Sequence, residues 1–391
     1  MRISYYCQHV LGIGHLRRSL EICKALAMHH ETTLILGGPP TSIDTTGLAT
    51  LYLPGLQMDS EFKNLTPCDS SASLETTKQK RQETLYNHFT SFSPHCFITE
   101  LYPFGRKAFR FELDPILKDI KNGILPACKC VSSVRDILVE KLQGKEKFEQ
   151  RVVDTLNKYY TTVLIHADPE IITLDETFSP LAKINIPIQY TGFVSEQPSH
   201  STKQHIREGL NLSRQQKLIV LSVGGGGGGV GDDLLHATLA AFKKMIETNP
   251  LAHLQVFTGP YCSQRVYDTI RSHRQHNITV DRFSHSFPDW LTAADLSISM
   301  AGYNTCMNLL QTGVPALVLP FLQNREQALR AAKLGDKAPI ATLTPDDLSA
   351  RILSAKMVNQ LKLQPTITAI KLCGADESCK IINTLLGNEK T

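Results

Sequence analysis

The chain has 391 residues, more than a single hydrophobic core usually spans, so two domains are expected. Its formal net charge is only +4, and no block of lysine and arginine is interleaved with aromatic residues, which argues against a groove for nucleic acid. The ten cysteines show neither a Cys-x-x-Cys pair nor a zinc-type cysteine and histidine spacing, so we expect reduced thiols in a cytoplasmic protein.

The sequence contains no candidate membrane span. No stretch reaches the ~20 apolar residues that a spanning helix needs. The N-terminus starts directly with a strand pattern instead of the apolar core of a signal peptide. We therefore expect a cytoplasmic protein, with peripheral contact to the inner face of a membrane left open.

Short apolar runs alternate with helical patterns along the first half of the chain, which is typical of a parallel sheet with helices on both faces. The segment Leu16–Met28 has apolar residues at helical spacing and predicts a helix that faces a core. Residues 58–80 are rich in Ser, Thr, Asp and Lys and predict a mobile loop. The strands predicted in this half are Arg2–Cys7, Thr33–Gly37, Cys96–Thr99, Ala127–Ser132, Thr162–His166 and Ile188–Thr191.

The second half repeats this alternation after a polar segment without periodicity, Ser195–Lys203, which predicts a linker. We therefore predict an α/β fold of two Rossmann-like, doubly wound domains, residues 1–194 and 195–391, with the last helix free to pack back on the first domain. Such domains bind ligands at the carboxyl ends of their strands, which here would face an interdomain cleft. The strands predicted in this half are Leu218–Val223, Leu254–Thr258, Ile278–Arg282, Leu296–Ser299 and Ala316–Leu319.

Six consecutive glycines, residues 224–229, separate the apolar run Leu218–Val223 from an amphipathic segment that begins near Asp232. A strand, then glycines, then a helix start lets backbone N–H groups approach a phosphate. No Gly-Lys-Ser/Thr follows, which excludes a Walker loop, and the glycines lack the spacing of a dinucleotide fingerprint. The run predicts a site for a diphosphate, and a merely flexible loop is the alternative.

The first predicted strand is followed by a turn, Gly12-Ile13-Gly14-His15, that opens a helix. The dipole at a helix N-terminus disfavours protonated histidine, so His15 is a candidate general base. Glu100 lies at the end of another predicted strand. It either orients His15 or binds a substrate hydroxyl, or it forms an ion pair with Arg106 or Arg110.

A second turn of the phosphate-binding kind lies at residues 301–305, where Ala-Gly-Tyr-Asn-Thr follows a predicted strand and opens a helix. Its glycine and hydroxyl suit the other side of a diphosphate. Two such helix starts, this one and the one after the glycine run, are hard to explain by packing alone. They strengthen the prediction of a nucleotide or nucleotide-sugar ligand.

With these motifs in view, the second half resembles the carboxyl-terminal domain of family 28 glycosyltransferases. This is a GT-B group that includes the N-acetylglucosaminyltransferase of the lipid II pathway. The first half is similar through Gly12-Ile13-Gly14-His15, a shorter motif that GT-B enzymes share. The matching text of the second half is ADLSISMAGYNT at residues 294–305, GVPALVLP at residues 313–320, and Arg325-Glu326-Gln327 with Ala331 nearby.

The resemblance implies transfer of a hexose or N-acetylhexosamine from a nucleotide-sugar, usually a UDP-sugar, without a metal or other cofactor. His15 would deprotonate the acceptor with Glu100 beside it, and Gly14 would belong to the binding turn. By position, the diphosphate would contact Gly225, Gly226, Gly227, Gly228, Ala301, Gly302, Asn304 and Thr305. The base would lie against Phe283 and Ser284, and the donor sugar would meet Glu326 and Gln327.

One residue departs from the family pattern. Family members typically place a glutamate a few residues after the threonine to hold the ribose hydroxyls, and here that position is Asn308. An amide oxygen still accepts a hydrogen bond from a hydroxyl, but it lacks the strength of a carboxylate. The base and ribose preference of the donor site is therefore left open.

The acceptor is not identified by the sequence. The resemblance implies a lipid-linked molecule or a cell-envelope glycan precursor, which family members dock on an apolar and basic patch. The residues available for such a patch also fit an ordinary helix with one core face: Phe104, Arg106, Lys107, Phe109, Arg110 and Phe111.

Two other functions remain open at this point. Gly12-Ile13-Gly14-His15-Leu16-Arg17-Arg18 also resembles the Gly-x-Gly-His-x-x-Arg start of hydrolases that release a sugar from UDP with a histidine-activated water. The same histidine would serve in both enzymes, so the sequence does not separate them. The third possibility is a nucleotide-sugar-binding protein without catalysis.

Overall fold

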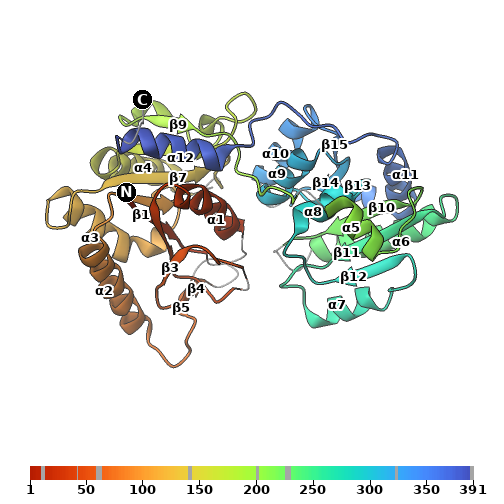
Figure 1. Ribbon diagram of the computed structural model, residues 1–391, viewed down its shortest axis with the longest axis horizontal. Coiled ribbons are helices and arrows are strands. Elements are labelled where there is room, and N and C mark those ends of the chain that lie inside the picture. The colour runs from red at the N-terminus through yellow and green to blue at the C-terminus, as the bar shows by residue number, and fades with distance from the viewer. Residues whose placement is uncertain are drawn as a thin grey trace. The chain divides into compact units, whose positions relative to one another are not determined.

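The computed structural model of the protein describes residues 1–9, 14–41, 43–58, 64–139, 143–199, 202–224, 230–321 and 325–387. The chain forms two compact units, one of residues 1–194 and 371–391 and the other of residues 195–370 (Figure 1). The last helix, which the sequence left free to join either domain, is part of the first unit.

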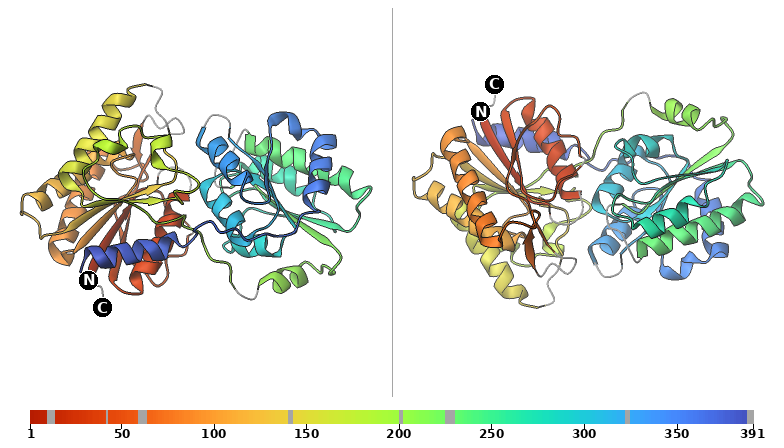
Figure 2. Two further views of the ribbon diagram at one scale, coloured as in Figure 1. Left: turned by 90° about the horizontal axis from the view of Figure 1, so that it is seen from above. Right: turned by 90° about the horizontal axis from the view of Figure 1, so that it is seen from below.

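The first unit is built on a seven-stranded parallel sheet with the strand order β3-β2-β1-β6-β7-β8-β9. Its inner strands are buried along almost their whole length, since helices lie on both faces of the sheet (Figure 2). The strands are β1 Arg2–Cys7, β2 Glu31–Leu36, β3 Ala49–Tyr52, β6 Cys96–Glu100, β7 Lys129–Arg135, β8 Thr162–His166 and β9 Ile188–Tyr190.

Five α-helices cover this sheet in the part of the chain that the structure describes. The last helix lies beside the first, and its Cys379 and Ile382 join the same apolar cluster as Leu20 and Leu26. The helices are α1 Gly14–Ala27, α2 Leu74–Phe92, α3 Arg110–Lys121, α4 Lys145–Tyr159 and α12 Gly374–Leu385, with one-turn helices at Lys107–Phe109, Leu174–Glu176 and Leu181–Lys183.

A fully buried arginine on α2 fixes the loops that follow β1 and β2. The Arg81 guanidinium donates to the Glu112 carboxylate at 2.6 Å, to the Gly37 carbonyl at 2.7 Å and to the Gln8 amide oxygen at 2.8 Å. Breaking a buried pair by removing one partner typically destabilises a protein by about 3–5 kcal/mol. Arg81 therefore holds the carboxyl edge of the first sheet in one conformation.

The second unit contains a six-stranded parallel sheet with the strand order β12-β11-β10-β13-β14-β15. Its strands are β10 Lys217–Ser222, β11 Ala252–Phe257, β12 Ile278–Asp281, β13 Leu296–Met300, β14 Ala316–Leu319 and β15 Ile340–Thr342. Its helices are α5 Thr202–Gly209, α6 Val230–Ile246, α7 Gln264–Arg271, α8 Phe287–Ala293, α9 Tyr303–Thr312, α10 Arg325–Gly335 and α11 Ala350–Gln360, with a one-turn helix at Pro345–Leu348.

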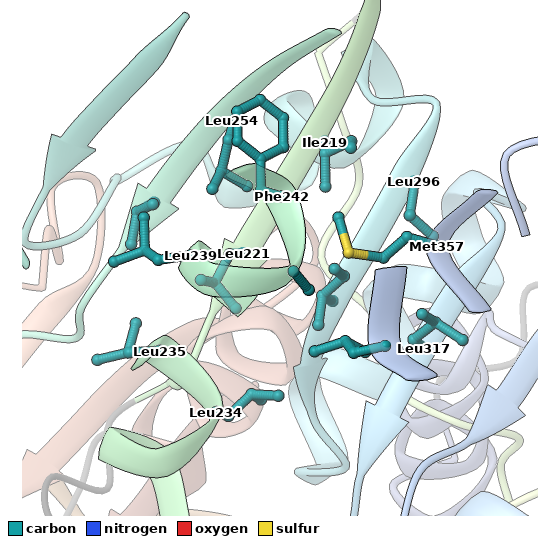
Figure 3. Packing of buried hydrophobic residues seen from close by; sticks show 14 of the residues in the cluster. Ile219, Leu221, Leu234, Leu235, Leu239, Phe242, Leu254, Leu296, Leu317 and Met357 are labelled. Carbon is teal, nitrogen blue, oxygen red and sulfur yellow. The ribbon is translucent and has the colours of Figure 1, made fainter. Parts of the chain in front are cut away.

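The core of the second unit lies between its sheet and the helix pair α6 and α11. Phe242 of α6 and Met357 of α11 are fully buried against Ile219, Leu254 and Leu296 of the strands (Figure 3). Burying a side chain of this size stabilises the fold by about 1.5–3 kcal/mol relative to leaving it exposed. This packing explains why the apolar residues of α6 recur at helical spacing.

The strand order reverses once in the middle of each sheet, between β1 and β6 in the first unit and between β10 and β13 in the second. From the reversal point, successive strands are added outward in both directions. Ligands of open α/β sheets bind at such a point, beyond the carboxyl ends of the two strands. Each unit therefore has one topologically favoured binding position.

The sequence predictions of fold class and strand position are confirmed with small shifts at the strand ends. The predicted loop at residues 58–80 is wrong in part, because β4 (Leu56–Met58) pairs with β5 (Leu65–Pro67) as a hairpin and α2 starts at Leu74. The Ser73 side chain caps that helix by accepting from Thr76 N–H. The short edge strands β3 and β15 had no distinct apolar run and were not predicted.

Candidate functional site

The candidate catalytic residues of the first unit lie together at the reversal point of its sheet. His15 is the second residue of α1, the helix that follows β1, and Glu100 is the last residue of β6. The two strands are direct neighbours, with Tyr6 opposite Thr99. The topology thus brings together two residues that are 85 positions apart in the sequence.

His15 and Glu100 form a hydrogen-bonded pair, with 2.6 Å between Nδ1 and Oε1. A carboxylate only accepts, so the Nδ1–H of His15 donates and the tautomer of the ring is fixed. The Nε2 atom is then left with a lone pair. Glu100 is completely buried, while 21% of the His15 side chain is exposed, so the imidazole is the part of the pair that a ligand can reach.

Two arginines surround the same carboxylate. Arg18 donates to Glu100 Oε1 at 2.6 Å, and Arg106 lies 3.4 Å from Oε2. Burial alone would raise the pKa of Glu100, but its interaction with His15 and the charges of Arg106 and Arg18 hold it well below its ordinary value. Glu100 is therefore an anion at neutral pH.

The same surroundings keep His15 neutral. Burial lowers the pKa of the imidazole to about 4; the guanidiniums of Arg106 and Arg18 act in the same direction, while Glu100 opposes them. The position in the first turn of α1 adds to this effect, because a cation is unfavourable at a helix N-terminus. A neutral imidazole with a free Nε2 lone pair can accept a proton at pH 7.

The turn after Glu100 is strained, and it carries Arg106. Leu101 and Arg106 have φ angles of 63° and 55°, in the left-handed region that costs a residue with a side chain about 1–3 kcal/mol. Backbone bonds from Leu101 N–H to the Ser133 carbonyl (2.8 Å) and from Gly105 N–H to the Leu101 carbonyl (2.7 Å) hold the turn. Strain of this kind clusters at functional sites, which supports a role for this turn.

A chain of buried polar side chains lies behind the pair. The Ser133 hydroxyl contacts the Tyr5 hydroxyl at 2.8 Å and His166 Nε2 at 2.7 Å, and His166 Nδ1 contacts the Thr191 hydroxyl at 2.9 Å. Ser133 stands opposite Glu100 in the sheet. The sequence analysis did not single out Ser133 or His166. His166 could have been noticed, because it is the last residue of β8, just as Glu100 is the last residue of β6.

Arg18 was also not assigned a role from the sequence, although its place in Gly-x-Gly-His-x-x-Arg was the available signal.

Of the residues considered for an acceptor patch, Phe104 and Phe109 are buried, and the Phe104 ring packs edge-on against Phe178. Arg110 pairs with Asp114 at 2.8 Å and not with Glu100. These residues fit the alternative of a helical segment with a core face.

In the second unit, the predicted phosphate-binding turns follow the two strands at the reversal point, β10 and β13. Gly224 has a φ of 72°, and residues Gly225, Gly226, Gly227 and Gly228 lie outside the described residues. The helix α6 begins at Val230, so the glycine run does connect a strand end to a helix start.

A close backbone contact shapes the start of the glycine run. Gly259, in the loop after β11, has a φ of 86°, and a Cβ there would lie only 2.2 Å from the Gly224 carbonyl oxygen. Its own N–H donates to the Arg282 carbonyl at 2.7 Å. The loops after β10, β11 and β12 are thus packed backbone to backbone, and position 259 has room only for glycine.

The turn after β13 leads into a helix whose N-cap is a glycine, a residue with no side chain to cap it. Gly302 is the N-cap residue of α9 and forms no side-chain cap, and Ala301 N–H is held by the Leu319 carbonyl at 3.2 Å. Asn304 and Thr305 lie in the first turn of this helix. An anion is favoured at such a position by the helix dipole and by the N–H groups of the first turn.

The remaining predicted donor-site residues lie in the loop after β12, on α9 and at the start of α10. Phe283 and Ser284 are partly exposed in the loop after β12, with the Phe283 ring 4.8 Å from that of His285. Asn308 lies farther along α9 and is 6% exposed. Glu326 and Gln327 start α10, and the Gln327 side-chain oxygen accepts from Phe321 N–H at 2.9 Å.

Metal and membrane sites were sought among the described residues only. They hold no cluster of three or more His, Cys, Asp or Glu side chains that could bind a metal ion. All ten cysteines are free thiols. None of the helices in the described part of the chain is long and apolar enough to cross a membrane.

Comparisons with solved structures identify the fold. The structure resembles a putative UDP-N-acetylglucosamine 2-epimerase from Listeria monocytogenes, with a TM-score of 0.63 and 11% identity. The likeness covers 100% of this chain and 97% of the epimerase chain. Over 99% of both chains it resembles MurG of Acinetobacter baumannii, with a TM-score of 0.54 and 13% identity. The chain has the fold of the GT-B proteins, two Rossmann-like domains.

The family signal lies in the second unit. Residues 220–370 match the glycosyltransferase family 28 C-terminal domain, which confirms the predicted resemblance. A relative in Bacillus cereus (strain ATCC 10987 / NRS 248), UDP-N-acetylglucosamine--N-acetylmuramyl-(pentapeptide) pyrophosphoryl-undecaprenol N-acetylglucosamine transferase 1, is 28% identical over 137 residues. The matched segment spans 34% of this chain and 38% of the relative.

The buried, neutral histidine behind Glu100 predicts a specific loss of stability in acid. Burial lowers the pKa of His166 to about 3, whereas an unfolded chain has an ordinary histidine near 6.5. Between these pH values the unfolded chain binds one proton more than the native protein, so the free energy of unfolding falls as the pH falls. Between pH 7 and pH 5 this loss is about 2 kcal/mol.

The prediction is checked by urea unfolding, followed by circular dichroism and fitted with two transitions because the chain has two units. The variant His166→Gln should have a lower free energy of unfolding than wild type at pH 7. When the pH falls from 7 to 5, its free energy of unfolding should decrease by about 2 kcal/mol less than that of wild type. The control is His29→Gln, an exposed histidine of the same unit. An identical pH dependence in wild type and His166→Gln would contradict the prediction.

Proposed function

We propose that the protein is a metal-independent glycosyltransferase that moves a hexose or N-acetylhexosamine from a UDP-sugar to an acceptor hydroxyl. The observation that carries this proposal is the family 28 match over residues 220–370, because that segment contains both turns that the sequence predicts to bind phosphate. The fold alone does not carry it, since an epimerase shares the fold as well.

The donor site follows from the chemistry of the leaving group. Breaking a sugar–diphosphate bond builds negative charge on the diphosphate, and backbone amides with helix dipoles stabilise that charge where other enzymes use a metal. Gly225–Gly228 and the turn Ala301–Thr305 would supply these groups. Phe283 and Ser284 would contact the base, Asn308 the ribose, and Glu326 and Gln327 the donor sugar.

The acceptor chemistry rests on His15. The acceptor hydroxyl must lose its proton as it attacks, and a placed base accelerates such a step by about 10²–10⁴-fold. His15 would take this proton on Nε2, because Nδ1–H is committed to Glu100. The Glu100 anion would stabilise the imidazolium that forms, while Arg18 and Arg106 keep the carboxylate ionised.

The proposed acceptor class is a lipid-linked molecule or a cell-envelope glycan precursor, at the inner surface of a membrane. It is inferred from the relative, whose name gives an undecaprenol-linked acceptor and a UDP-N-acetylglucosamine donor. The matched segment covers only 38% of that relative, so substrate and location are carried over as proposals.

The donor is tested by a thermal-shift screen of nucleotides and nucleotide-sugars. A ligand at 100 times its Kd adds about 2.7 kcal/mol to stability, so UDP and one UDP-sugar should raise Tm measurably. Incubation of that UDP-sugar without an acceptor should then release UDP slowly. Fast stoichiometric release would favour a UDP-sugar hydrolase instead, with His15 activating water.

Glu100→Gln tests the acceptor base. A neutral amide does not stabilise the imidazolium, and its NH₂ group can donate to Nδ1 and so place the proton on Nε2, which removes the base. We expect kcat to fall by about 10²–10⁴-fold while the affinity for UDP is kept. His15→Ala should act in the same direction, and Asp114→Asn, at a half-exposed carboxylate on α3, is the control. Unchanged turnover in both site variants would indicate a role other than this base.

Gly302→Asp tests the phosphate site, with opposite effects on stability and on ligand affinity. Gly302 has a φ of −67°, and a Cβ there would meet only Thr305 Oγ1 at 4.0 Å, so a side chain fits. An aspartate should cap α9 and stabilise it by a few tenths of a kcal/mol. The same carboxylate should repel a diphosphate and weaken UDP binding by at least about tenfold.

Calorimetry with UDP measures this change, and Gly302→Ala, which adds a Cβ but no charge, is the matched control. The alanine variant should bind UDP nearly as well as wild type. If Gly302→Asp also binds UDP with wild-type affinity, the helix N-terminus of α9 is not the phosphate site.

A further inference from the structure

A pocket of about 490 Å³ lies between the helices α3 and α4 of the first unit. These neighbouring helices follow the adjacent strands β6 and β7 (Figure 1). Natural small-molecule sites enclose about 300–1,000 Å³, so this α3–α4 pocket has room for a ligand. Neither His15 nor Glu100 lines it. Its charged side chains are Arg110, Asp114, Lys147, Arg151, Asp154 and Lys158.

Three of the four cations in the pocket come from one side of α4. Lys147, Arg151 and Lys158 follow one another at the spacing of helical turns, so they line the same face of the helix. Like charges one turn apart repel each other and destabilise a helix. The stability of α4 therefore does not explain why these cations share one face.

The two carboxylates of the pocket are already engaged by other groups. Asp114 accepts from Arg110 at 2.8 Å and from the Tyr102 hydroxyl. Asp154 accepts from the side-chain amide of Gln150 at 2.8 Å. In the described part of the chain, none of the three cations on α4 forms a salt bridge. The positive charge of α4 is thus not matched by these carboxylates.

Arg151 is the most enclosed of the three cations, since it is partly buried whereas the two lysines are exposed. Burial lowers the pKa of Arg151, and the charge of Arg110 acts in the same direction, while Tyr102 and Asp114 oppose it. The guanidinium carbon lies 5.3 Å from the centre of the Phe148 ring, whose face attracts a cation only weakly. The surroundings of Arg151 therefore favour an added anion.

A phosphate group matches this pocket in charge and in hydrogen bonding. A guanidinium donates to two phosphate oxygens at once, and an ammonium donates to a third. The hydroxyls of Thr155 and Tyr159 also line the pocket and can bind the uncharged part of a small molecule. Exposed lysines on a flat helix face are simply solvated, but here the cations surround an enclosed space.

We propose that the α3–α4 pocket binds a small phosphorylated molecule, with a phosphate against Arg151 and with Arg110 and Lys147 beside it. Lys158 lies about 10 Å farther along the helix axis and suits a second polar or anionic group of the same ligand. This inference does not depend on the proposed function, because it uses none of the residues assigned to the donor or the acceptor base.

The test uses pyrophosphate as the probe and the full chain as the protein. Acetic anhydride acetylates exposed lysines, and mass spectrometry measures the rate at each lysine, with ionic strength held constant by sodium chloride. We expect pyrophosphate to slow acetylation of Lys147 at least about threefold, as a ligand that covers the amine does at twice its Kd. Lys145 should react at an unchanged rate, because it is on the same helix but does not line the pocket.

Arg151→Gln removes the central charge and keeps a side chain that is compatible with a helix. The pyrophosphate concentration that gives half of the protection of Lys147 should rise at least about tenfold in this variant. Lys145→Gln is the matched control: it removes one charge from the same helix outside the pocket, and it should leave the protection unchanged. Circular dichroism confirms folding of both variants, and the wild-type comparison of Lys147 with Lys145 needs no variant.

Three results would overturn the inference: no protection of Lys147, equal protection of Lys147 and Lys145, or unchanged protection in Arg151→Gln. A second arm replaces pyrophosphate with vesicles of phosphatidylcholine and phosphatidylglycerol in equal amounts. Protection of Lys147 by these vesicles but not by pyrophosphate would indicate a lipid surface and contradict a small-molecule site.

Discussion

The reversal of strand order in each sheet is the constraint on which the rest of the molecule depends. Two neighbouring parallel strands whose chains continue in opposite directions leave their carboxyl ends uncovered by their own connections. In the first unit this point lies between β1 and β6, and in the second between β10 and β13. Each candidate site is found there, and each is assembled from segments that only the sheet brings together.

The two units use this position in different chemical ways. The first unit places side chains there, and a buried carboxylate is tolerated because two guanidiniums compensate the loss of water around it. The second unit offers mainly backbone, through glycines and a helix whose N-cap is one of them, Gly302. Side chains suit proton transfer, whereas backbone amides suit a charge spread over several oxygens.

Much of this arrangement could be predicted from residue patterns. Apolar runs of four to six residues placed most of the strands, since buried parallel strands read as continuous apolar segments. His15 and Glu100 could be named because each follows or ends such a run. Their contact could not be predicted, because it depends on β1 and β6 being neighbours, which no local pattern determines.

Three buried arginines show most clearly what could not be predicted from the sequence. Arg18, Arg81 and Arg330 are almost or completely buried, yet their sequence neighbourhoods are those of ordinary amphipathic helices. A charged residue on a helix is exposed far more often than buried, so a sequence reading assigns it to the surface. Their contacts across the fold, which include Glu100, Glu112 and the Ala301 carbonyl, are not encoded in these local patterns.

The return of the chain to its first unit has a consequence for synthesis on the ribosome. Cys379 and Ile382 of α12 complete the core that α1 and β1 begin, and Val194 forms a bridge with Cys373. The second unit, residues 195–370, is contiguous and can fold once it has emerged. The first unit, although its larger part is translated earlier, has to keep an apolar surface exposed until residues 371–391 have left the exit tunnel. The amino-terminal unit is therefore completed only after the whole of the second unit has been translated.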